Sequence, residues 1–257
     1  MMSARALDPA AFMEQAGLPP DAWQRDYLRS EAQRLLLNCS RQSGKSTSTA
    51  ALALHEALYH PPALILLLSP SLRQSQELFR KVLDVYRMID ATVPSEQESA
   101  LRLELQNGSR IVSLPGKEGT VRGYSGVRLL VVDEAARVLD SLYYSVRPML
   151  AVSGGRLVCL STPFGQRGFF YEAWTGGEDW ARIKLTADQC PRIPPEFLAE
   201  EQRTLGSFWF RQEYGCEFLA TEDSLLDPAQ VDRAFSTEVE PLHLFGNNTL
   251  SNGVRHE

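Results

Sequence analysis

The sequence contains few cysteines, no long apolar run and no excess of positive charge. Its 257 residues include 4 cysteines, which lie far apart and form no CxxC pair. A disulfide scaffold is therefore excluded, and reduced, mostly buried thiols are expected, as in a cytosolic protein. The longest apolar run, residues 63–68, is far shorter than the roughly 18 residues of a membrane-spanning helix. Residues 1–8 show no signal peptide.

The charge balance is acidic, with 26 Lys+Arg against 32 Asp+Glu and a formal net charge of −6. This balance excludes a basic coat over the whole surface, so any contact with a polyanion must come from a local patch. The 4 histidines show no spacing typical of zinc ligands. A 44% share of hydrophobic and a 23% share of charged residues are typical of a soluble globular domain.

Short apolar strands alternate with helical segments along most of the chain. Helices are expected over residues 44–59 and 72–89, and Asn107-Gly108 predicts a β-hairpin between residues 101–105 and 110–114. Strands are expected over residues 34–38, 63–68, 127–132, 156–160 and 182–185. The pattern predicts an α/β fold, with a mostly parallel central sheet flanked by helices and a hairpin insertion. We expect one domain over residues 1–220 and a linker or disordered tail over residues 221–257.

A phosphate-binding loop is predicted between the first strand and the helix that follows it. The segment Cys39-Ser40-Arg41-Gln42-Ser43-Gly44-Lys45-Ser46 has the strand-loop-helix context that such a loop requires. Its backbone N–H groups would surround a phosphate, Lys45 would add a positive charge, and Ser46 would offer a hydroxyl to Mg²⁺. Cys39 replaces the usual first glycine, which requires a negative φ there. The alternative is an accidental Gly-Lys-Ser at a helix start.

Two carboxylates follow the apolar strand that ends at Val132. Asp133, at the carboxyl end of this strand, would hold Mg²⁺ through water, and Glu134 would take a proton from the attacking water. The alternative is an acidic cap at a helix start. The adjacent glutamate favours the branch of P-loop NTPases with a catalytic glutamate (ASCE type), which carries an extra strand between the two motifs. Residues 63–68 are the candidate for that strand.

Ser161 and Thr162 follow a further apolar strand and precede Pro163. A hydroxyl at this point could bond a phosphate or the attacking water and so sense hydrolysis. The alternative is a helix N-cap with proline in the first turn, and both roles are compatible.

These motifs resemble the large terminase subunit of tailed phages, the motor that packs DNA into capsids. The resemblance spans about residues 20 to 220. It rests on Trp23-Gln24, the loop 40–46, Ser69-Pro70, Val121-Arg122-Gly123, 131–136, 160–165, Phe169-Phe170-Tyr171 and Phe210-Arg211-Gln212-Glu213-Tyr214-Gly215-Cys216-Glu217-Phe218. The last string is the most specific, because it has no general ATPase rationale.

The resemblance implies an ATPase that uses ATP and Mg²⁺ to translocate double-stranded DNA into a viral capsid. It implies a homo-oligomeric ring, a pentamer, on the capsid, with the portal protein and the small terminase subunit as partners and no membrane. The setting would be the cytoplasm of an infected or prophage-carrying bacterium. Within the loop, the nucleotide-binding residues would be Ser40, Arg41, Gln42, Ser43, Gly44, Lys45, Ser46 and Thr47.

Several roles follow only from the resemblance. Trp23 and Gln24 match the segment that reads adenine, and Arg41 matches a loop arginine that touches the γ-phosphate or relays its loss. Arg122 matches the arginine finger that reaches the neighbouring subunit's nucleotide, while Ser161 and Thr162 match the coupling motif. The alternatives are a surface glutamine for Gln24, a solvated charge for Arg41, and a DNA or surface contact for Arg122.

DNA contact is the least determined part of the sequence. Basic residues in the hairpin and the following loop would line a ring pore, or equally be solvated charges on a sheet edge. They are Arg102, Arg110, Lys117 and Arg128.

The chain departs from the family in one large respect. About forty residues after Tyr214 cannot build the RNase H-like nuclease of a complete large terminase, so no nuclease activity is expected. A lone ATPase domain, an early end of the reading frame and a phage remnant all fit. Two other functions stay open: a helicase-like translocase, for whose second motor domain the chain has no room, and an inactive nucleotide-binding remnant.

Overall fold

The computed structural model describes residues 4–89, 93–116, 123–176 and 179–220. Contacts between Cα atoms divide the chain into one unit over Met1–Leu219 and another over Ala220–Glu257. The fold below is that of the first unit. The predicted tail, residues 221–257, lies outside the described residues, so its boundary stays a prediction.

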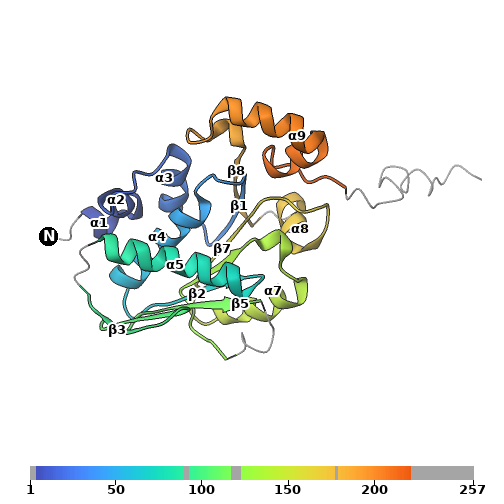
Figure 1. The fold of residues 1–257 in the computed structure, drawn as a ribbon. Helices are drawn as coiled ribbons and strands as arrows, with labels where there is room; N and C mark the ends of the chain where they lie inside the picture. The colour runs from blue at the N-terminus through green and yellow to red at the C-terminus, as the bar shows by residue number, and fades with distance from the viewer. Residues whose placement is uncertain (1–3, 90–92, 117–122, 177–178, 221–257) are drawn as a thin grey trace, which may run out of the picture. The chain divides into compact units, whose positions relative to one another are not determined.

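An eight-stranded sheet forms the centre of this unit, in the order β3-β4-β5-β2-β6-β7-β1-β8 (Figure 1). Every pairing from β5 to β8 is parallel, whereas β3 and β4 are antiparallel to their neighbours. The strands are β1 (Arg34–Cys39), β2 (Leu64–Ser69), β3 (Ser95–Glu98), β4 (Arg102–Leu105), β5 (Arg110–Pro115), β6 (Leu129–Asp133), β7 (Arg156–Ser161) and β8 (Ala181–Leu185).

Helices cover both faces of the sheet (Figure 1). The helices are α1 (Ala4–Leu7), α2 (Pro9–Gln15), α3 (Ala22–Arg29), α4 (Lys45–Tyr59), α5 (Leu72–Met88), α7 (Asp140–Val146), α8 (Gly168–Gly176) and α9 (Pro195–Glu213). Short 3₁₀ turns are η1 (Ala135–Arg137), η2 (Arg147–Leu150) and η3 (Ala187–Gln189).

Alternate residues of the strands enter two separate cores. Leu35 and Leu37 pack with α2 to α5 on one face, whereas Leu36 packs with α7 and α8 on the other. A strand that is buried on both faces carries apolar side chains on both, which explains why residues 64–68 of β2 form an unbroken apolar run. The predicted α/β fold with helices on both faces is confirmed.

The order of the strands corrects one expectation. Residues 63–68 were expected to supply the strand between the two nucleotide motifs, but β2 lies on the outer side of β6, and β7 separates β6 from β1. Register places Asn38 opposite Ser161, and Asp133 opposite Leu160. Strand order depends on crossover connections, which a local apolar pattern does not encode.

The predicted hairpin at Asn107-Gly108 is confirmed, because β4 and β5 pair in an antiparallel manner around it. Asn107 accepts from the Ser109 backbone N–H at 2.9 Å, and Gly108 takes a φ of +83° that favours glycine. The structure adds β3, a short strand that pairs with β4 and that the sequence pattern did not predict.

All four cysteines are buried and free, as expected. Burial raises the pKa of the Cys39 thiol to about 12. Among the described residues, no helix combines the length and the apolar character needed to cross a membrane.

Candidate active site

The loop between β1 and α4 has the backbone of a phosphate-binding loop. Cys39 ends β1 and does not take a positive φ, which is the condition its Cβ imposes. Gln42 (φ 59°) and Gly44 (φ 84°) take the left-handed conformations instead. The Ser43 hydroxyl donates to the Ser40 carbonyl at 2.8 Å, and α4 begins at Lys45. The loop is therefore curled at the N-terminus of a long helix, where backbone N–H groups attract anions.

A pocket of about 470 Å³ opens above this loop. Its wall contains the loop residues 41–47, together with Gln74, Lys81, Glu134, Arg137 and Thr162. The cations in this wall are Arg41, Lys45, Lys81 and Arg137, against the single carboxylate of Glu134. An acidic chain thus has a cationic pocket, which suits a polyphosphate.

Glu134 stands next to the Lys45 ammonium. Lys45 Nζ lies 3.8 Å from Glu134 Oε1, and both side chains are largely buried. Glu134 has a left-handed backbone, with φ 49° and ψ 43°. Such a conformation costs a non-glycine residue about 1 kcal/mol, and strain of this kind is concentrated at functional sites.

Asp133 is buried at the carboxyl end of β6, with 6% of its surface exposed. Burial, reinforced by the neighbouring Glu134 carboxylate and opposed by Lys45, raises its pKa to about 7. Its Oδ1 atom is buried and has no hydrogen-bond partner among the residues that the structure describes. A buried acceptor without a donor fits a cation or a cation-bound water, and the Ser46 hydroxyl in the pocket wall supplies a second oxygen. Both residues offer oxygen atoms of the kind that Mg²⁺ prefers, and their role in holding it stays a prediction.

Ser161 and Thr162 follow the apolar residues of β7, the strand between the two motifs. Thr162 enters the pocket wall, and its Oγ1 accepts from Arg137 Nη1 at 3.1 Å. Ser161 is fully buried, and within the described part of the chain its hydroxyl has no hydrogen-bond partner. The sheet thus brings the three predicted motifs to one edge, because β6, β7 and β1 are neighbours.

Gln24 and Trp23 lie on α3 beside the loop, outside the residues that line the pocket. Gln24 is 1% exposed; its Oε1 accepts from the Asp21 backbone N–H at 2.9 Å and its Nε2 donates to the Gly44 carbonyl at 3.3 Å. Trp23 is partly buried against the core. Gln24 therefore braces the loop, and the adenine-reading role of both residues stays a prediction.

Sequence reasoning missed Gln74, Lys81 and Arg137 in the pocket wall, and Arg192 and Glu213 beside it. Arg137 contacts Glu134, Thr162 and Glu213, and Glu213 also accepts from Arg41 Nε at 2.7 Å. Arg192 donates to the Ser43 carbonyl and pairs with Asp21 at 2.7 Å. Glu213 belongs to the string 210–218, so the string's unexplained specificity was a usable signal. Arg137, three residues after Glu134, was within helical reach of it.

Arg122 and Lys117 lie outside the described residues. Of the other predicted DNA contacts, Arg102 pairs with Glu104, and Arg128 donates from Nε to Glu56 at 2.5 Å. Arg110 is exposed at the start of β5. The DNA role of these residues stays a prediction.

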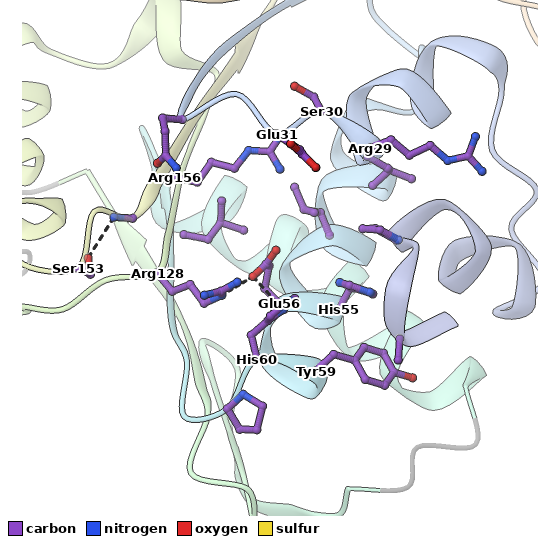
Figure 2. A pocket seen from close by; sticks show the side chains of 18 of the residues that line it. Arg29, Ser30, Glu31, His55, Glu56, Tyr59, His60, Arg128, Ser153 and Arg156 are labelled. Carbon is purple, nitrogen blue, oxygen red and sulfur yellow. Dashed lines mark hydrogen bonds and ion pairs between the residues drawn. The ribbon is translucent and has the colours of Figure 1, made fainter. Parts of the chain in front are cut away.

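A larger cavity, of about 970 Å³, lies at the opposite edge of the sheet (Figure 2). Arg128 and Arg156 in its wall stand at the amino ends of β6 and β7. Ligands of open α/β sheets bind at the carboxyl ends of the strands, so the smaller pocket above the loop is the candidate active site.

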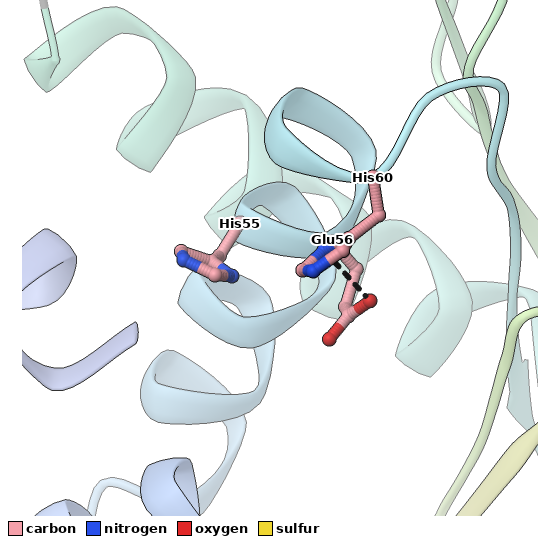
Figure 3. A group of neighbouring side chains, drawn as sticks. All are labelled: His55, Glu56 and His60. Atoms are coloured by element: carbon pink, nitrogen blue, oxygen red, sulfur yellow. Dashed lines mark ion pairs between the residues drawn. The ribbon is translucent and has the colours of Figure 1, made fainter. Parts of the chain in front are cut away.

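His55, Glu56 and His60 lie close together at the end of α4 (Figure 3), and all three line this second cavity. Their ligand atoms lie within 4.8 Å of one another, a grouping the sequence spacing did not predict. Glu56 already accepts from Arg128 and lies 3.3 Å from His60 Nδ1, while the His55 ring packs edge-on to Phe12. The Arg128 guanidinium and the His60 ring both lie against Oε2 of Glu56, so a metal ion would compete with them for this oxygen.

A family model described as "Terminase large subunit, T4likevirus-type, N-terminal" matches residues 36–230. The large terminase subunit of Thermus phage G20c is 26% identical over 250 residues, which cover 83% of this chain and 52% of that protein. The chain thus spans about half the length of the curated relatives it matches.

Solved structures show the same fold. The large terminase ATPase domain of Thermus phage P74-26 has a TM-score of 0.72 and 25% identity, covering 81% of this chain and 98% of that domain. The large terminase of another thermophilic bacteriophage, solved in complex with ADP, has a TM-score of 0.59 and 14% identity, covering 85% and 54% of the two chains.

Proposed function

This chain belongs to the family of terminase large subunits, as its ATPase-bearing N-terminal part, and we propose that it hydrolyses ATP to drive double-stranded DNA into a viral capsid. One observation carries the proposal above the others. A cationic pocket over the loop 41–47 contains the carboxylate of Glu134 beside the ammonium of Lys45. A phosphate-binding loop and a carboxylate base are the parts that attack of water on a γ-phosphate needs.

In the proposed chemistry, Lys45 neutralises charge on the β- and γ-phosphates, and Arg41 contacts the γ-phosphate or relays its loss. Glu134 orients the attacking water and accepts its proton on a carboxylate oxygen. Thr162 and Ser161 couple hydrolysis to motion. Gln24 with Trp23 is the proposed reader of adenine, for which Gln24 must exchange its bonds to Asp21 and Gly44 for bonds to the base. The ADP bound to the terminase of the thermophilic bacteriophage, which shares this fold, supports a nucleotide as the ligand of this chain.

A divalent metal ion fits this site, because Asp133 holds a buried unpartnered oxygen and Ser46 a hydroxyl in the pocket wall. Asp133 and Ser46 would hold Mg²⁺, which neutralises phosphate charge when bound. The chain itself then supplies Glu134, which orients the attacking water and serves as the base.

Arg122 is proposed to act on the nucleotide of a neighbouring copy, which requires a homo-oligomeric ring, a pentamer on the capsid. An arginine finger supplied in this way is worth about 10³ to 10⁵ in rate in other phosphoryl-transfer systems. The portal protein and the small terminase subunit are the proposed partners. Arg102, Arg110, Lys117 and Arg128 are the candidate DNA contacts, and the setting is the cytoplasm of an infected or prophage-carrying bacterium.

The substitution Glu134→Gln tests the base. The amide cannot accept the proton from water but keeps the size of the side chain, so steady-state hydrolysis should fall by at least about 100-fold. Nucleotide affinity, measured by equilibrium titration, should stay within threefold of the wild-type value, because Lys45 and the loop are unchanged.

Glu77→Gln is the matched control, since Glu77 is an exposed carboxylate of α5 that pairs with Arg80 and lies outside the residues that line the pocket. It should hydrolyse ATP at the wild-type rate. Wild-type turnover by Glu134→Gln would show that this carboxylate is not the base.

A further inference from the structure

Arg137 joins three parts of the site that the sequence keeps far apart. Its Nη1 donates to Glu134 Oε2 at 3.0 Å and to Thr162 Oγ1 at 3.1 Å, and its Nη2 donates to Glu213 Oε1 at 3.2 Å. One guanidinium therefore touches the proposed base, the hydroxyl after β7 and the last residue of α9.

The surroundings of Arg137 fix its plane. The guanidinium lies 4.8 Å from the centre of the Phe164 ring, and the side chain is 24% exposed. An arginine offers rigid, planar donors, so stacking on one face leaves its orientation set by the acceptors at its edge. Those acceptors are Glu134, Thr162 and Glu213, which makes the orientation of Glu134 and that of Arg137 mutually dependent.

Glu213 is the anchor of this arrangement. Its side chain is 9% exposed; one oxygen accepts from Arg137 and the other from Arg41 Nε at 2.7 Å. Its backbone carbonyl also accepts from the Arg41 N–H at 3.3 Å. A buried carboxylate held by two arginines is costly to displace, because either arginine would lose a charge-assisted bond. The end of α9 is thus tied to both the loop and Arg137.

We propose that Arg137 is a positioning residue that holds the Glu134 carboxylate in the orientation needed to activate water, and that Glu213 sets Arg137 in place. Turnover then depends on how the end of α9 is seated against the site. The proposal rests on the ATPase function proposed above and makes the end of α9 the element that controls its turnover. Arg137 acts through Glu134 and is not itself a catalytic residue.

The test compares the full chain with its Arg137→Ala, Arg137→Lys and Glu213→Gln variants at one protein concentration. Arg137→Ala should lower kcat by about 10- to 100-fold, the effect of a small misplacement of a catalytic group. Arg137→Lys keeps the positive charge but not the planar guanidinium, so its kcat should lie between that of Arg137→Ala and that of the wild type. Nucleotide affinity should stay within threefold throughout.

Glu213→Gln should lower kcat by a smaller factor, about 3- to 10-fold, since it weakens the bonds to Arg137 and Arg41 without removing the side chain. In the Arg137→Ala background, Glu213→Gln should lower kcat by a smaller factor than it does alone, because the two changes share the Arg137–Glu213 contact and only the bond to Arg41 is left to weaken. Additive losses in kcat would contradict the proposal. A thermal melt of each variant identifies any that fails to fold, and the conservative Arg137→Lys and Glu213→Gln variants then carry the test.

Arg211→Ala is the matched control. Arg211 also lies at the end of α9 and pairs with a carboxylate, Glu217, at 2.6 Å, but this pair is exposed. Its kcat should stay within twofold of wild type. A loss of nucleotide affinity with unchanged kcat in Arg137→Ala would make Arg137 a phosphate ligand and overturn the proposal. Wild-type kcat in Arg137→Ala alongside an inactive Glu134→Gln would also overturn it while leaving the ATPase function intact.

Discussion

At the scale of single residues, the phosphate-binding loop combines a chemical and a conformational requirement. Lys45 is required for its positive charge, and the motif in the sequence already predicts it. Gly44 is required for two reasons. The first is its φ of 84°, which favours glycine. The second is space, because a Cβ there would lie 2.8 Å from Arg192 Nη2 and 2.9 Å from Gln24 Nε2. The second reason was invisible in the sequence, because Arg192 is 148 residues away along the chain.

Gly44→Ala should therefore cost more than backbone strain alone. A left-handed alanine costs roughly 1–2 kcal/mol, and the added Cβ must also displace the two braces of the loop. We expect a lower melting temperature and at least about tenfold weaker nucleotide binding, since loop geometry positions the phosphate donors. Calorimetric melting and nucleotide titration measure the two effects.

Gly17→Ala is the control, because Gly17 has a similar φ of 77° and, apart from its chain neighbours, no described residue has an atom within 4 Å of an added Cβ. This variant should be less stable by the cost of the left-handed backbone alone, and its nucleotide affinity should equal that of the wild type. Equal affinity in Gly44→Ala and Gly17→Ala would show that Arg192 and Gln24 do not matter to the loop.

At the scale of elements, strands were predictable and their order was not. The continuous apolar runs gave β1, β2, β6 and β7 to within about two residues, because burial on both faces leaves a strong local pattern. The place of β7 between β6 and β1 depends on long connections that no local pattern records. The sequence thus predicted that three motifs exist, and the fold showed which strand lies between them.

Helix α9 was missed for a related reason. Its residues form no long apolar stripe, and Gly206 interrupts it with a φ of 74°. Its end is nevertheless tied to the site: Asn38, fully buried in β1, donates from Nδ2 to the Cys216 carbonyl at 3.0 Å. This contact joins residues 178 apart in the chain, and only the folded chain reveals it.

Asn38→Ala should loosen the segment after α9. The buried Cys216 carbonyl would lose its side-chain donor, at a cost of about 1–3 kcal/mol. Amide hydrogen exchange over residues 208–219 should become faster, and kcat should fall because Glu213 lies in this segment.

Asn107→Ala is the matched control, since Asn107 also donates to a backbone carbonyl, that of Ala57, at 3.0 Å, but from the hairpin. It should lower overall stability without selective exposure of residues 208–219. Identical exchange patterns in the two variants would contradict a specific role for Asn38.

At the scale of the whole molecule, a net charge of −6 coexists with a cationic pocket. The charge balance of the whole chain gave no indication of the site. The family match covers residues 36–230, and the chain spans about half of its curated relatives. The predicted DNA contacts Arg102 and Arg128 already pair with carboxylates, so DNA binding must compete with those pairs.

The most direct test of the account is complementation of ATPase activity between two inactive variants. Arg122→Ala retains Glu134 but lacks the proposed finger, and Glu134→Gln retains the finger but lacks the base. Each alone should turn over ATP at least about 100-fold more slowly than wild type. An equimolar mixture should recover activity that rises with protein concentration, because each variant supplies what its neighbour lacks. A mixture as inactive as its components at every concentration, or a wild-type rate in Arg122→Ala alone, would contradict it.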